Sequence, residues 1–484
     1  MKPLKSIVIT CLGVLAIAVL FFGPRAGSDV PPGRIVIDYW EKWTADEEAQ
    51  MRLIVNEFNE SVGKEKNIFV RYVSTSNVNQ KALVATAAGV PPDVAGLWDG
   101  NLVQFAELDA LEPLEEMAAA HGINSSTYKP VYWNACNYNG HLYALISTPA
   151  AVALHYNKKA FAENADALRK AGLDPNRAPA TIKELDAYAK VLEKVDSAGH
   201  ITRSGYLPME PGWYVTSTHI WFDGDYWNPT THKFTFTDPK VVASFAWLQS
   251  YSKRLGKDAI SEFRSGTGNF DSPQNPFLTG TVVMEQQGPW MANYILNLKP
   301  SMSGVKQPYA DDVFLPLELR QQHCEWAAAP FPSNEPGKTY VSLCNFDTLV
   351  IPKGSKHKQE AFEFIAYVNR QEVMERLCRM HSKNSPLAKV SQDFLTHHKN
   401  PYIKVFEDLA SSPNARALPQ SPILPEVGDE MNNVIQRLVL LRDEPEPALR
   451  VLQAQLQEKY DKFAEIQRIR REKAAAENKQ LVEK

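Results

Sequence analysis

The sequence predicts an α/β fold in which a mostly parallel sheet carries helices on its faces. From residue 34 to residue 88, segments with strand alternation and segments with helical spacing follow one another twice. This alternation is typical of a parallel sheet flanked by helices. The chain has 484 residues, which is too long for one ordinary core, so we expect about two to three domains.

The first elements follow from the spacing of apolar residues and from the chain breakers between them. Met51, Ile54, Val55 and Phe58 recur at helical spacing. The double proline at 91–92 ends the next helix before a short strand. The expected elements are a strand at 34–39, a helix at 46–61, a strand at 68–73, a helix at 79–88 and a strand that ends at Trp98.

Residues 139–158 predict a place where the chain passes from one sheet to another. Asn139-Gly140 indicates a tight turn, and two short apolar runs, 142–146 and 152–156, follow it. Ser147-Thr148-Pro149 separates the two runs. We therefore expect two strands joined by a break, with the ligand cleft beside this crossing.

The second half continues with helices and strands. Thr181 with Glu184 three residues on is typical of a helix start, and Asp238-Pro239 predicts another helix through Leu255. Further predicted elements are a strand at 277–284, a strand at 342–351 and a helix at 359–370. From residue 447 the chain becomes mostly charged, with leucines at helical spacing, which predicts a long terminal helix that packs at first and then frays. A coiled-coil or partner helix is the alternative interpretation.

The N-terminus has the form of an export signal. Lys2 and Lys5 precede an uncharged apolar run at 7–22. This run is near the lower limit for crossing a bilayer, so residues 1–27 are either a cleaved signal peptide or an uncleaved membrane anchor.

Composition and charge exclude several classes of protein. With 44% hydrophobic and 22% charged residues the chain is an ordinary globular sequence. A net charge of −4 without a long basic block in the body of the chain gives no reason to expect nucleic acid. Cys136, Cys324, Cys344 and Cys378 lie far apart in sequence. Two disulfides are conceivable, but buried free thiols are preferred for at least two of these residues, and no metal or cofactor is expected.

Several short motifs together resemble one family. They are Trp40, Ala88-Gly89-Val90-Pro91-Pro92-Asp93-Val94, Leu111-Glu112-Pro113-Leu114, Gly140-His141-Leu142-Tyr143-Ala144-Leu145, Leu154-His155-Tyr156-Asn157-Lys158, residues 277–284 with Gly288-Pro289-Trp290, and residues 351–358. Each motif is weak alone, but in this order the chain resembles the family 1 extracellular solute-binding proteins of ABC sugar importers, the maltose-binding-protein-like group. The resemblance covers about residues 33–400.

The resemblance implies a two-lobe periplasmic-binding-protein fold of type II, with an extra C-terminal helix here. It implies an N-terminal lobe of residues 33–148 and 284–338, a C-terminal lobe of 149–283 and 339–446, and a charged helix at 447–484. Crossings are expected at 147–150, 277–284 and 340–345. A sugar or oligosaccharide would close between the lobes, and the partners would be the transmembrane subunits of an ABC permease with their ATPase.

A sugar site needs flat aromatic faces and groups that hydrogen bond to hydroxyls. In open α/β sheets ligands gather at the carboxyl ends of strands, where Glu41, Trp43, Trp98 and Asp99 lie. An isolated tryptophan is more often a packing residue than a ligand platform. The candidate ligand-binding residues are Glu41, Trp43, Trp98, Asp99, Tyr156, Trp221, Asp223, Glu285, Trp290, Asn345 and Phe346, and the aromatic stretch at 213–227 makes Trp221 the strongest among them.

Two other classes of function remain open at this point. A glycoside hydrolase could use two carboxylates such as Glu41 and Glu285, but the chain carries no nucleophile elbow, zinc helix or Walker loop. The expectation is therefore a protein without enzymatic activity. The second alternative is a membrane-tethered sugar sensor or scaffold that uses the terminal helix as its contact with a signalling partner.

Overall fold

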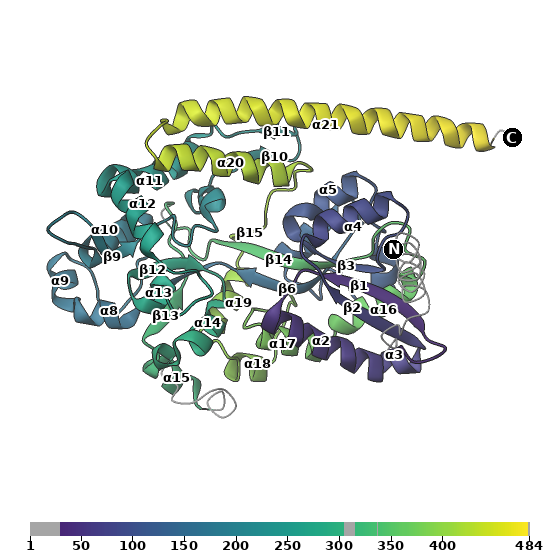
Figure 1. Ribbon diagram of the computed structural model, residues 1–484, viewed down its shortest axis with the longest axis horizontal. Helices are drawn as coiled ribbons and strands as arrows, with labels where there is room; N and C mark the ends of the chain where they lie inside the picture. Colours follow the sequence, from purple (N-terminus) through teal and green to yellow (C-terminus); the bar gives the residue numbers. More distant parts are fainter. Residues whose placement is uncertain (1–29, 304–314, 336, 483–484) are drawn as a thin grey trace, which may run out of the picture.

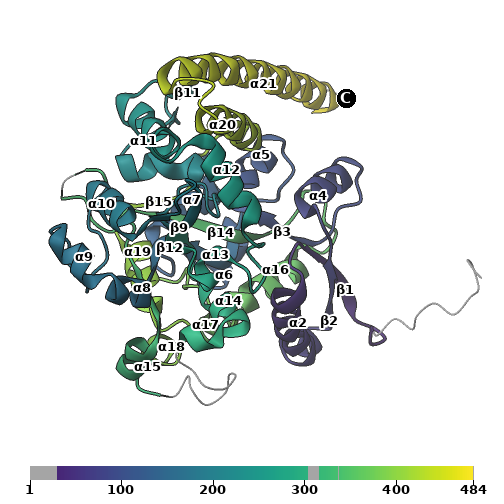
Figure 2. The ribbon, with the colours of Figure 1, turned by 60° about the vertical axis from the view of Figure 1, so that its left-hand side comes forward.

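The computed structural model of the chain describes residues 30–303, 315–335 and 337–482. Two β-sheets lie side by side, and helices pack around each of them (Figures 1 and 2). In Figure 1 the first sheet lies to the right and the second to the left, and β6 and β14 of the first sheet lie in the centre. The predicted α/β fold with two lobes is thus confirmed.

The first sheet carries the parallel strands expected near the N-terminus. Within the described residues its order is β15-β14-β3-β1-β2, and β6 also pairs with β14. β1 is parallel to β2 and β3, whereas β14 is antiparallel to β3 and to β6. The strands are β1 (Ile35–Glu41), β2 (Ile68–Ser74), β3 (Val94–Trp98), β6 (Leu145–Ala151), β14 (Ser342–Val350) and β15 (Ala415–Arg416).

The second sheet forms the core of the other lobe. Its order is β13-β7-β12-β9-β8, with β12 parallel to β9 and antiparallel to β7. Two short ribbons, β4 with β5 and β10 with β11, lie outside the sheets. The strands are β4 (Asn137–Tyr138), β5 (His141–Leu142), β7 (Ala153–Asn157), β8 (Lys194–Val195), β9 (Ile201–Tyr206), β10 (Trp227–Asn228), β11 (Lys233–Phe234), β12 (Val282–Gln287) and β13 (Trp326–Ala329).

Helices fill the connections. Up to β9 they are α2 (Ala45–Glu60), α3 (Val62–Glu65), α4 (Val78–Ala87), η1 (Asp99–Asn101), α5 (Leu102–Glu107), α6 (Glu115–Ala120), α7 (Pro130–Cys136), α8 (Lys158–Glu163), α9 (Ala165–Lys170) and α10 (Ile182–Leu192). After β9 they are η2 (Val215–Phe222), α11 (Pro239–Leu255), α12 (Lys257–Gly266), α13 (Pro276–Thr279), α14 (Met291–Leu298), η3 (Pro300–Ser303), α15 (Leu317–His323), α16 (Lys358–Val368), α17 (Gln371–Met380), α18 (Gln392–Thr396), α19 (Ile403–Ser411), α20 (Leu424–Val439) and α21 (Pro445–Val482).

The local signals in the sequence explain several of these elements. α2 buries the face predicted from its spacing, Met51, Ile54, Val55 and Phe58. Thr181 caps α10, because its hydroxyl accepts a hydrogen bond from the Glu184 amide at 3.1 Å. α11 begins at Pro239 as predicted, and the Asp238 side chain accepts from the Lys240 amide.

The predicted strand at 277–284 is wrong in its first half. Residues 276–279 form α13, because the Asn275 side chain accepts hydrogen bonds from the Phe277 and Leu278 amides and Pro276 suits the first turn of a helix. Gly280, with φ of +78°, ends this turn, and β12 begins only at Val282. The Asn275 cap therefore favours a helical turn more strongly than the apolar run favours a strand.

The predicted fraying of the terminal helix is also not observed. α21 runs without a break from Pro445 to Val482. Pairs such as Arg468 with Glu472 and Lys462 with Glu458 lie four residues apart on it. Such pairs support a helix even where no apolar face is buried.

The crossing predicted at 147–150 is present in the structure. β6 pairs with β14 in the first sheet, and after Val152 the chain continues as β7 in the second sheet. The lobe division expected from the resemblance places some strands differently. β12 and β13, from 284–338, pair with β7 and β9 of the second sheet, whereas β14, from 339–446, lies in the first. β14 lies in the first sheet because it pairs antiparallel with the crossing strand β6.

The predicted signal or anchor at 1–27 lies outside the described residues. None of the helices in the described ranges is both long enough and apolar enough to cross a membrane. Cys136, Cys324, Cys344 and Cys378 are all free and buried. The preference for free thiols over disulfides is confirmed for these four.

The packing of α21 on the second lobe leads to a first prediction. Leu452 is 1% exposed and lies in the core of that lobe, whereas its neighbour Val451 is 54% exposed. Leu452→Ala should lower the free energy of unfolding by about 2–5 kcal/mol, because it removes buried methyl groups and leaves a cavity. Urea unfolding followed by circular dichroism measures this. Val451→Ala is the matched control and should leave the midpoint unchanged; equal losses would contradict the packing.

Candidate functional site

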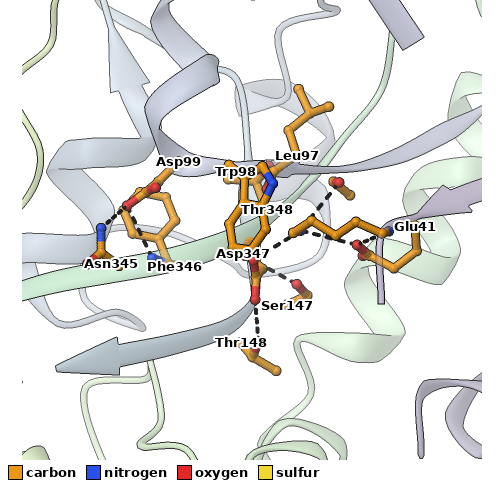
Figure 3. A network of polar contacts seen from close by, with 12 residues as sticks. Glu41, Leu97, Trp98, Asp99, Ser147, Thr148, Asn345, Phe346, Asp347 and Thr348 are labelled. Atoms are coloured by element: carbon orange, nitrogen blue, oxygen red, sulfur yellow. Dashed lines mark hydrogen bonds and ion pairs between the residues drawn. The ribbon is translucent and has the colours of Figure 1, made fainter. Parts of the chain in front are cut away.

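The site is organised around the Asp347 carboxylate on β14 (Figure 3). Its Oδ1 lies 3.0 Å from the Lys42 Nζ and its Oδ2 lies 3.3 Å from the Lys383 Nζ. The Thr148 hydroxyl on the crossing strand β6 donates to the same Oδ2 at 3.0 Å. Burial acts to raise the pKa of Asp347, but Lys42 and Lys383 outweigh it and hold the pKa well below 3.8.

Glu41 extends this cluster at the carboxyl end of β1. Its Oε1 accepts hydrogen bonds from the Lys42 amide at 2.7 Å and the Lys42 Nζ at 3.2 Å, and its Oε2 accepts from the Tyr39 hydroxyl at 2.6 Å. Burial raises the pKa of Glu41 against the lowering effect of Lys42. A Cβ on Gly96 of β3 would lie 1.9 Å from the Glu41 Oε2. This strand therefore needs glycine where the carboxylate approaches.

Glu47, in the first turn of α2, faces the other lysine. Its Oε1 lies 3.4 Å from the Lys383 Nζ and 3.6 Å from the His381 Nδ1. Burial lowers the pKa of His381 to about 4, so its imidazole is neutral at physiological pH. Lys383 is thus held between Asp347 and Glu47, as Lys42 is held between Asp347 and Glu41.

Indole rings surround the two ammonium groups on the first lobe. The Trp43 ring is 4% exposed and lies 5.6 Å from the Lys42 Nζ and 5.7 Å from the Lys383 Nζ. The Trp98 ring lies 4.6 Å from the Lys42 Nζ and is 53% exposed. Trp98 therefore presents a flat face to solvent directly beside the charged cluster.

Two further indoles complete the aromatic surface. Trp290, which follows β12, has its ring centroid 5.9 Å from the Lys383 Nζ and 6.3 Å from the ring of Trp213. Trp213 is 49% exposed and also lies 4.3 Å from the Phe270 ring. Both indoles follow strands of the second sheet, so the aromatic groups come from both lobes.

The charges in this cluster do not cancel. The two ammonium groups, Lys42 and Lys383, are paired with three carboxylates, Glu41, Glu47 and Asp347. Each lysine has two carboxylate partners within 4 Å. Both ammonium groups are therefore paired within the protein, and neither lysine is free to pair with an added anion.

Trp221 and Asp223 do not join this cluster, which corrects the strongest of the sequence-based candidates. Trp221 is 0% exposed, packs against Phe331 and donates its indole hydrogen to the Val341 carbonyl at 3.1 Å. Asp223 is paired with Lys240 and Lys338 on the outside of the second lobe. The η2 turn buries Trp221 as a core residue and leaves no ring face for a ligand.

Asp99, Asn345 and Phe346 form a structural tie beside the cluster. The Asp99 carboxylate accepts hydrogen bonds from the Asn345 Nδ2 at 3.1 Å, the Phe346 amide at 3.3 Å and the Gly100 amide at 2.8 Å. Burial raises the pKa of Asp99 to about 6 against these hydrogen bonds. Figure 3 shows this group to the left of Trp98 and Asp347, which lie one above the other in the centre, with Glu41 to the right. Its contacts join η1 to β14.

Glu285 and Tyr156 lie on opposite faces of the second sheet. Glu285 pairs across the strands with His155, and Tyr156 pairs with Met284. Glu285 is 1% exposed, its Oε1 has no hydrogen-bond partner among the described residues, and burial raises its pKa well above 4.5. The Tyr156 ring packs against Phe161 at 5.1 Å. Neither contacts the lysines of the cluster through a recorded hydrogen bond or ion pair in the part of the chain that the structure describes.

The residues that the structure describes contain no group of three or more histidine, cysteine or acidic side chains that could hold a metal ion. The cluster itself presents carboxylates, ammonium groups and indole rings. Such groups bind and orient a polar ligand.

The model of one protein family matches this chain over residues 54–402, and that family is described as bacterial extracellular solute-binding protein. The chain is a bacterial extracellular solute-binding protein. The predicted resemblance to this family is confirmed, and so is the type II periplasmic-binding fold with its extra C-terminal helix.

Curated relatives of this solute-binding protein are named for two kinds of ligand. The sn-glycerol-3-phosphate-binding periplasmic protein UgpB of Pectobacterium atrosepticum is 25% identical over 57% of this chain and 59% of its own length. The maltotriose-binding protein of Pyrococcus abyssi is 25% identical over 43% of this chain and 40% of its own length. The matches thus span about half the length of these relatives.

Solved structures resemble nearly the whole solute-binding protein. CpMnBP1 with mannobiose bound has a TM-score of 0.69 at 25% identity, covering 87% of this chain and 99% of that chain. The sugar-binding protein MalE of Xanthomonas citri has a TM-score of 0.71 at 20% identity, covering 89% and 99%. UgpB of Mycobacterium tuberculosis with glycerophosphocholine has a TM-score of 0.67 at 19% identity, covering 89% and 100%. The last two show the fold alone.

The residues of the charged cluster, Lys42, Glu47, Asp347 and Lys383, were not among the predicted site residues of the solute-binding protein, apart from their neighbour Glu41. Asp347 stands one residue after the predicted pair Asn345 and Phe346, and Lys42 stands between Glu41 and Trp43. No local sequence pattern marks Lys383 or Glu47 as a site residue, because only the fold brings each of them close to its partners. Trp213 lies in the aromatic stretch that favoured Trp221, and only its exposure distinguishes it.

The cluster predicts a pH-dependent effect of Asp347→Asn. At pH 7 the variant should lose about 3 kcal/mol of unfolding free energy, because two buried ammonium groups lose a shared counter-charge. The pKa of Asp347 is lowered on folding, so its contribution is fully present above its ordinary value of 3.8 and is lost progressively as the pH falls from there through the lowered pKa of the folded state. Urea unfolding at pH 7 and pH 2.5 should therefore show a smaller difference between wild type and variant at the lower pH.

Asp408→Asn is the control for this experiment. Asp408 forms an ion pair with Lys404 one helical turn away, with side chains 42% and 68% exposed. Its removal should change stability little at either pH. An Asp347→Asn variant as stable as Asp408→Asn at pH 7 would contradict the role of Asp347.

Proposed function

We propose that this protein is the extracytoplasmic substrate-binding component of an ABC importer. In this proposal it binds a sugar or oligosaccharide between its lobes and delivers it to the transmembrane subunits of a permease with their ATPase. The family description supports a location outside the cytoplasm. Attachment to the membrane through residues 1–27 is part of the proposal and concerns residues outside the described ranges.

The chemical groups in and around the cluster favour one class of ligand. The Glu47 carboxylate, whose side chain is 38% exposed, can accept hydrogen bonds from ligand hydroxyls, whereas Glu41 and Asp347 are buried. Trp98 and Trp213 offer flat apolar faces that suit the C–H side of a sugar ring. A neutral polyhydroxylated ring uses both kinds of group.

A phosphate ester is the rival ligand, because curated relatives are named for sn-glycerol 3-phosphate. Binding a phosphate dianion favours cations that are free to pair with it. Here both lysines already have two carboxylate partners each, and the three carboxylates leave a negative excess. These charges repel an anion and leave the neutral sugar as the favoured class.

Closure of the lobes would supply the transport mechanism. The first sheet contributes Trp98 and the second lobe contributes Trp213 and Trp290. A ligand held by both would make contacts that exist only in the closed form and would shift the equilibrium toward it. The permease would then recognise the closed form.

Calorimetric titration with neutral glycans and phosphate esters tests the choice of ligand. Mannobiose, mannotriose, maltose and maltotriose form one set; glycerol 3-phosphate and glycerophosphocholine form the other. We expect at least one glycan to bind with a dissociation constant of about 10 μM or below and neither phosphate ester to bind comparably. Binding of a phosphate ester alone would contradict the proposal.

Removal of the exposed indole tests the placement of the ligand. Trp98→Ala should weaken binding of the glycan identified above by about tenfold or more, since stacking on an aromatic face is lost. Val84→Ala removes an equally exposed apolar side chain of the same lobe, because Val84 is 63% exposed and Trp98 53%. The control should bind like wild type. If Trp98→Ala bound the glycan as tightly as wild type, the ligand would lie away from this cluster.

A further inference from the structure

The first half of α21 belongs to the second lobe. Leu449, Leu452 and Leu456 are buried in the core of that lobe. The Gln453 and Gln457 side chains accept hydrogen bonds from backbone amides of residues 237 and 234, at 3.0 and 3.1 Å. These contacts fix the direction of the helix relative to the second sheet.

The second half of α21 reaches the first lobe. The Arg471 Nη2 lies 2.5 Å from the Glu107 Oε2 at the end of α5. Glu107 is held in place, because its Oε1 also accepts a hydrogen bond from the Tyr138 hydroxyl at 2.8 Å. Figures 1 and 2 both show the helix extending beyond α20 toward α5. From Tyr460, which packs against Trp227 of the second lobe, to Arg471 an α-helix advances by about 16 Å.

This contact lies behind the crossing strand, on the side away from the charged cluster. Consecutive side chains of a strand point to opposite faces. Asp347 points to the two lysines, whereas Phe346 lines a small space with Asp99, Leu418 and Leu424. At that back side the start of α20 meets η1, since Leu418 and Leu424 lie within 3.7 Å of where a Gly100 Cβ would be. α20 and α21 thus touch the first lobe on the same side.

We propose that α21 is a strap that joins the two lobes behind the crossing strands and opposes their closure at the charged cluster. Bending about β6 and β14 that brings the front surfaces together must move the back surfaces apart. A rigid helix anchored on the second lobe then carries Arg471 away from Glu107. This inference rests on the hinge closure in the proposed function, but it concerns a contact that ligand binding does not require.

Interlobe distances in the full chain without ligand test the strap. Spin labels at Glu60→Cys on the first lobe and Lys170→Cys on the second occupy exposed sites, and double electron–electron resonance measures their separation. Arg471→Glu places two negative groups in contact, so the distribution should shift toward shorter, more closed distances by a few-fold change in the populations. The double variant Glu107→Arg with Arg471→Glu restores opposite charges and should return the distribution to that of wild type.

Arg468→Glu is the matched control. Arg468 lies one turn before Arg471 but pairs only with Glu465 and Glu472 of the same helix among its recorded ion pairs. Its substitution should leave the distances unchanged. An Arg471→Glu distribution identical to that of Arg468→Glu would overturn the strap.

The same samples distinguish a failure of the strap from a failure of the proposed function. If mannobiose shortens the distance in wild type while Arg471→Glu alone does not, the strap fails and the proposed function stands. If Arg471→Glu shortens the distance and the charge swap reverses it, the strap holds even where no glycan of the panel binds.

Discussion

The placement of one carboxylate between two ammonium groups is the constraint on which the rest of this site depends. Asp347 lies on the strand that pairs with both β3 and the crossing strand β6. Its partners come from the end of β1 and from the segment after α17. An unpaired buried charge costs several kcal/mol of folding free energy. The ion pairs therefore hold three segments of chain close together, although these segments are far apart in sequence. The exposed Trp98 ring lies beside this framework, 4.6 Å from the Lys42 Nζ.

The arrangement also explains how a negatively charged cluster can present a usable binding surface. Each lysine is neutralised within the protein, so the ligand does not have to supply a charge. Glu41 and Asp347 are buried, whereas the Glu47 side chain is 38% exposed and can accept a hydrogen bond from a ligand. Rigid aromatic faces at Trp98 and Trp213 lose little conformational entropy on binding.

Parts of this account could be predicted from the sequence because they are local. Strand ends and helix caps are encoded by neighbouring residues, and so Glu41, Trp43 and Trp98 could be placed at one edge of a sheet. Asp347 pairs with Lys42, about 300 positions away, and with Lys383, 36 positions away, and no local pattern predicts either pair. Trp213 and Trp221 share one aromatic stretch, and composition does not say which ring the η2 turn buries. The helical turn at 276–279 shows that a single asparagine cap can override an apolar run.

The central claim is that a neutral glycan lies against the indoles beside the Asp347 cluster. The most direct test is a crystal structure of the protein with mannobiose or whichever glycan of the panel binds. We expect a sugar ring stacked on Trp98 or Trp213, with hydroxyls within hydrogen-bond distance of the Glu41, Glu47 and Asp347 carboxylates or the two lysines. A glycan bound elsewhere, with these five side chains contacting no part of it, would contradict the account.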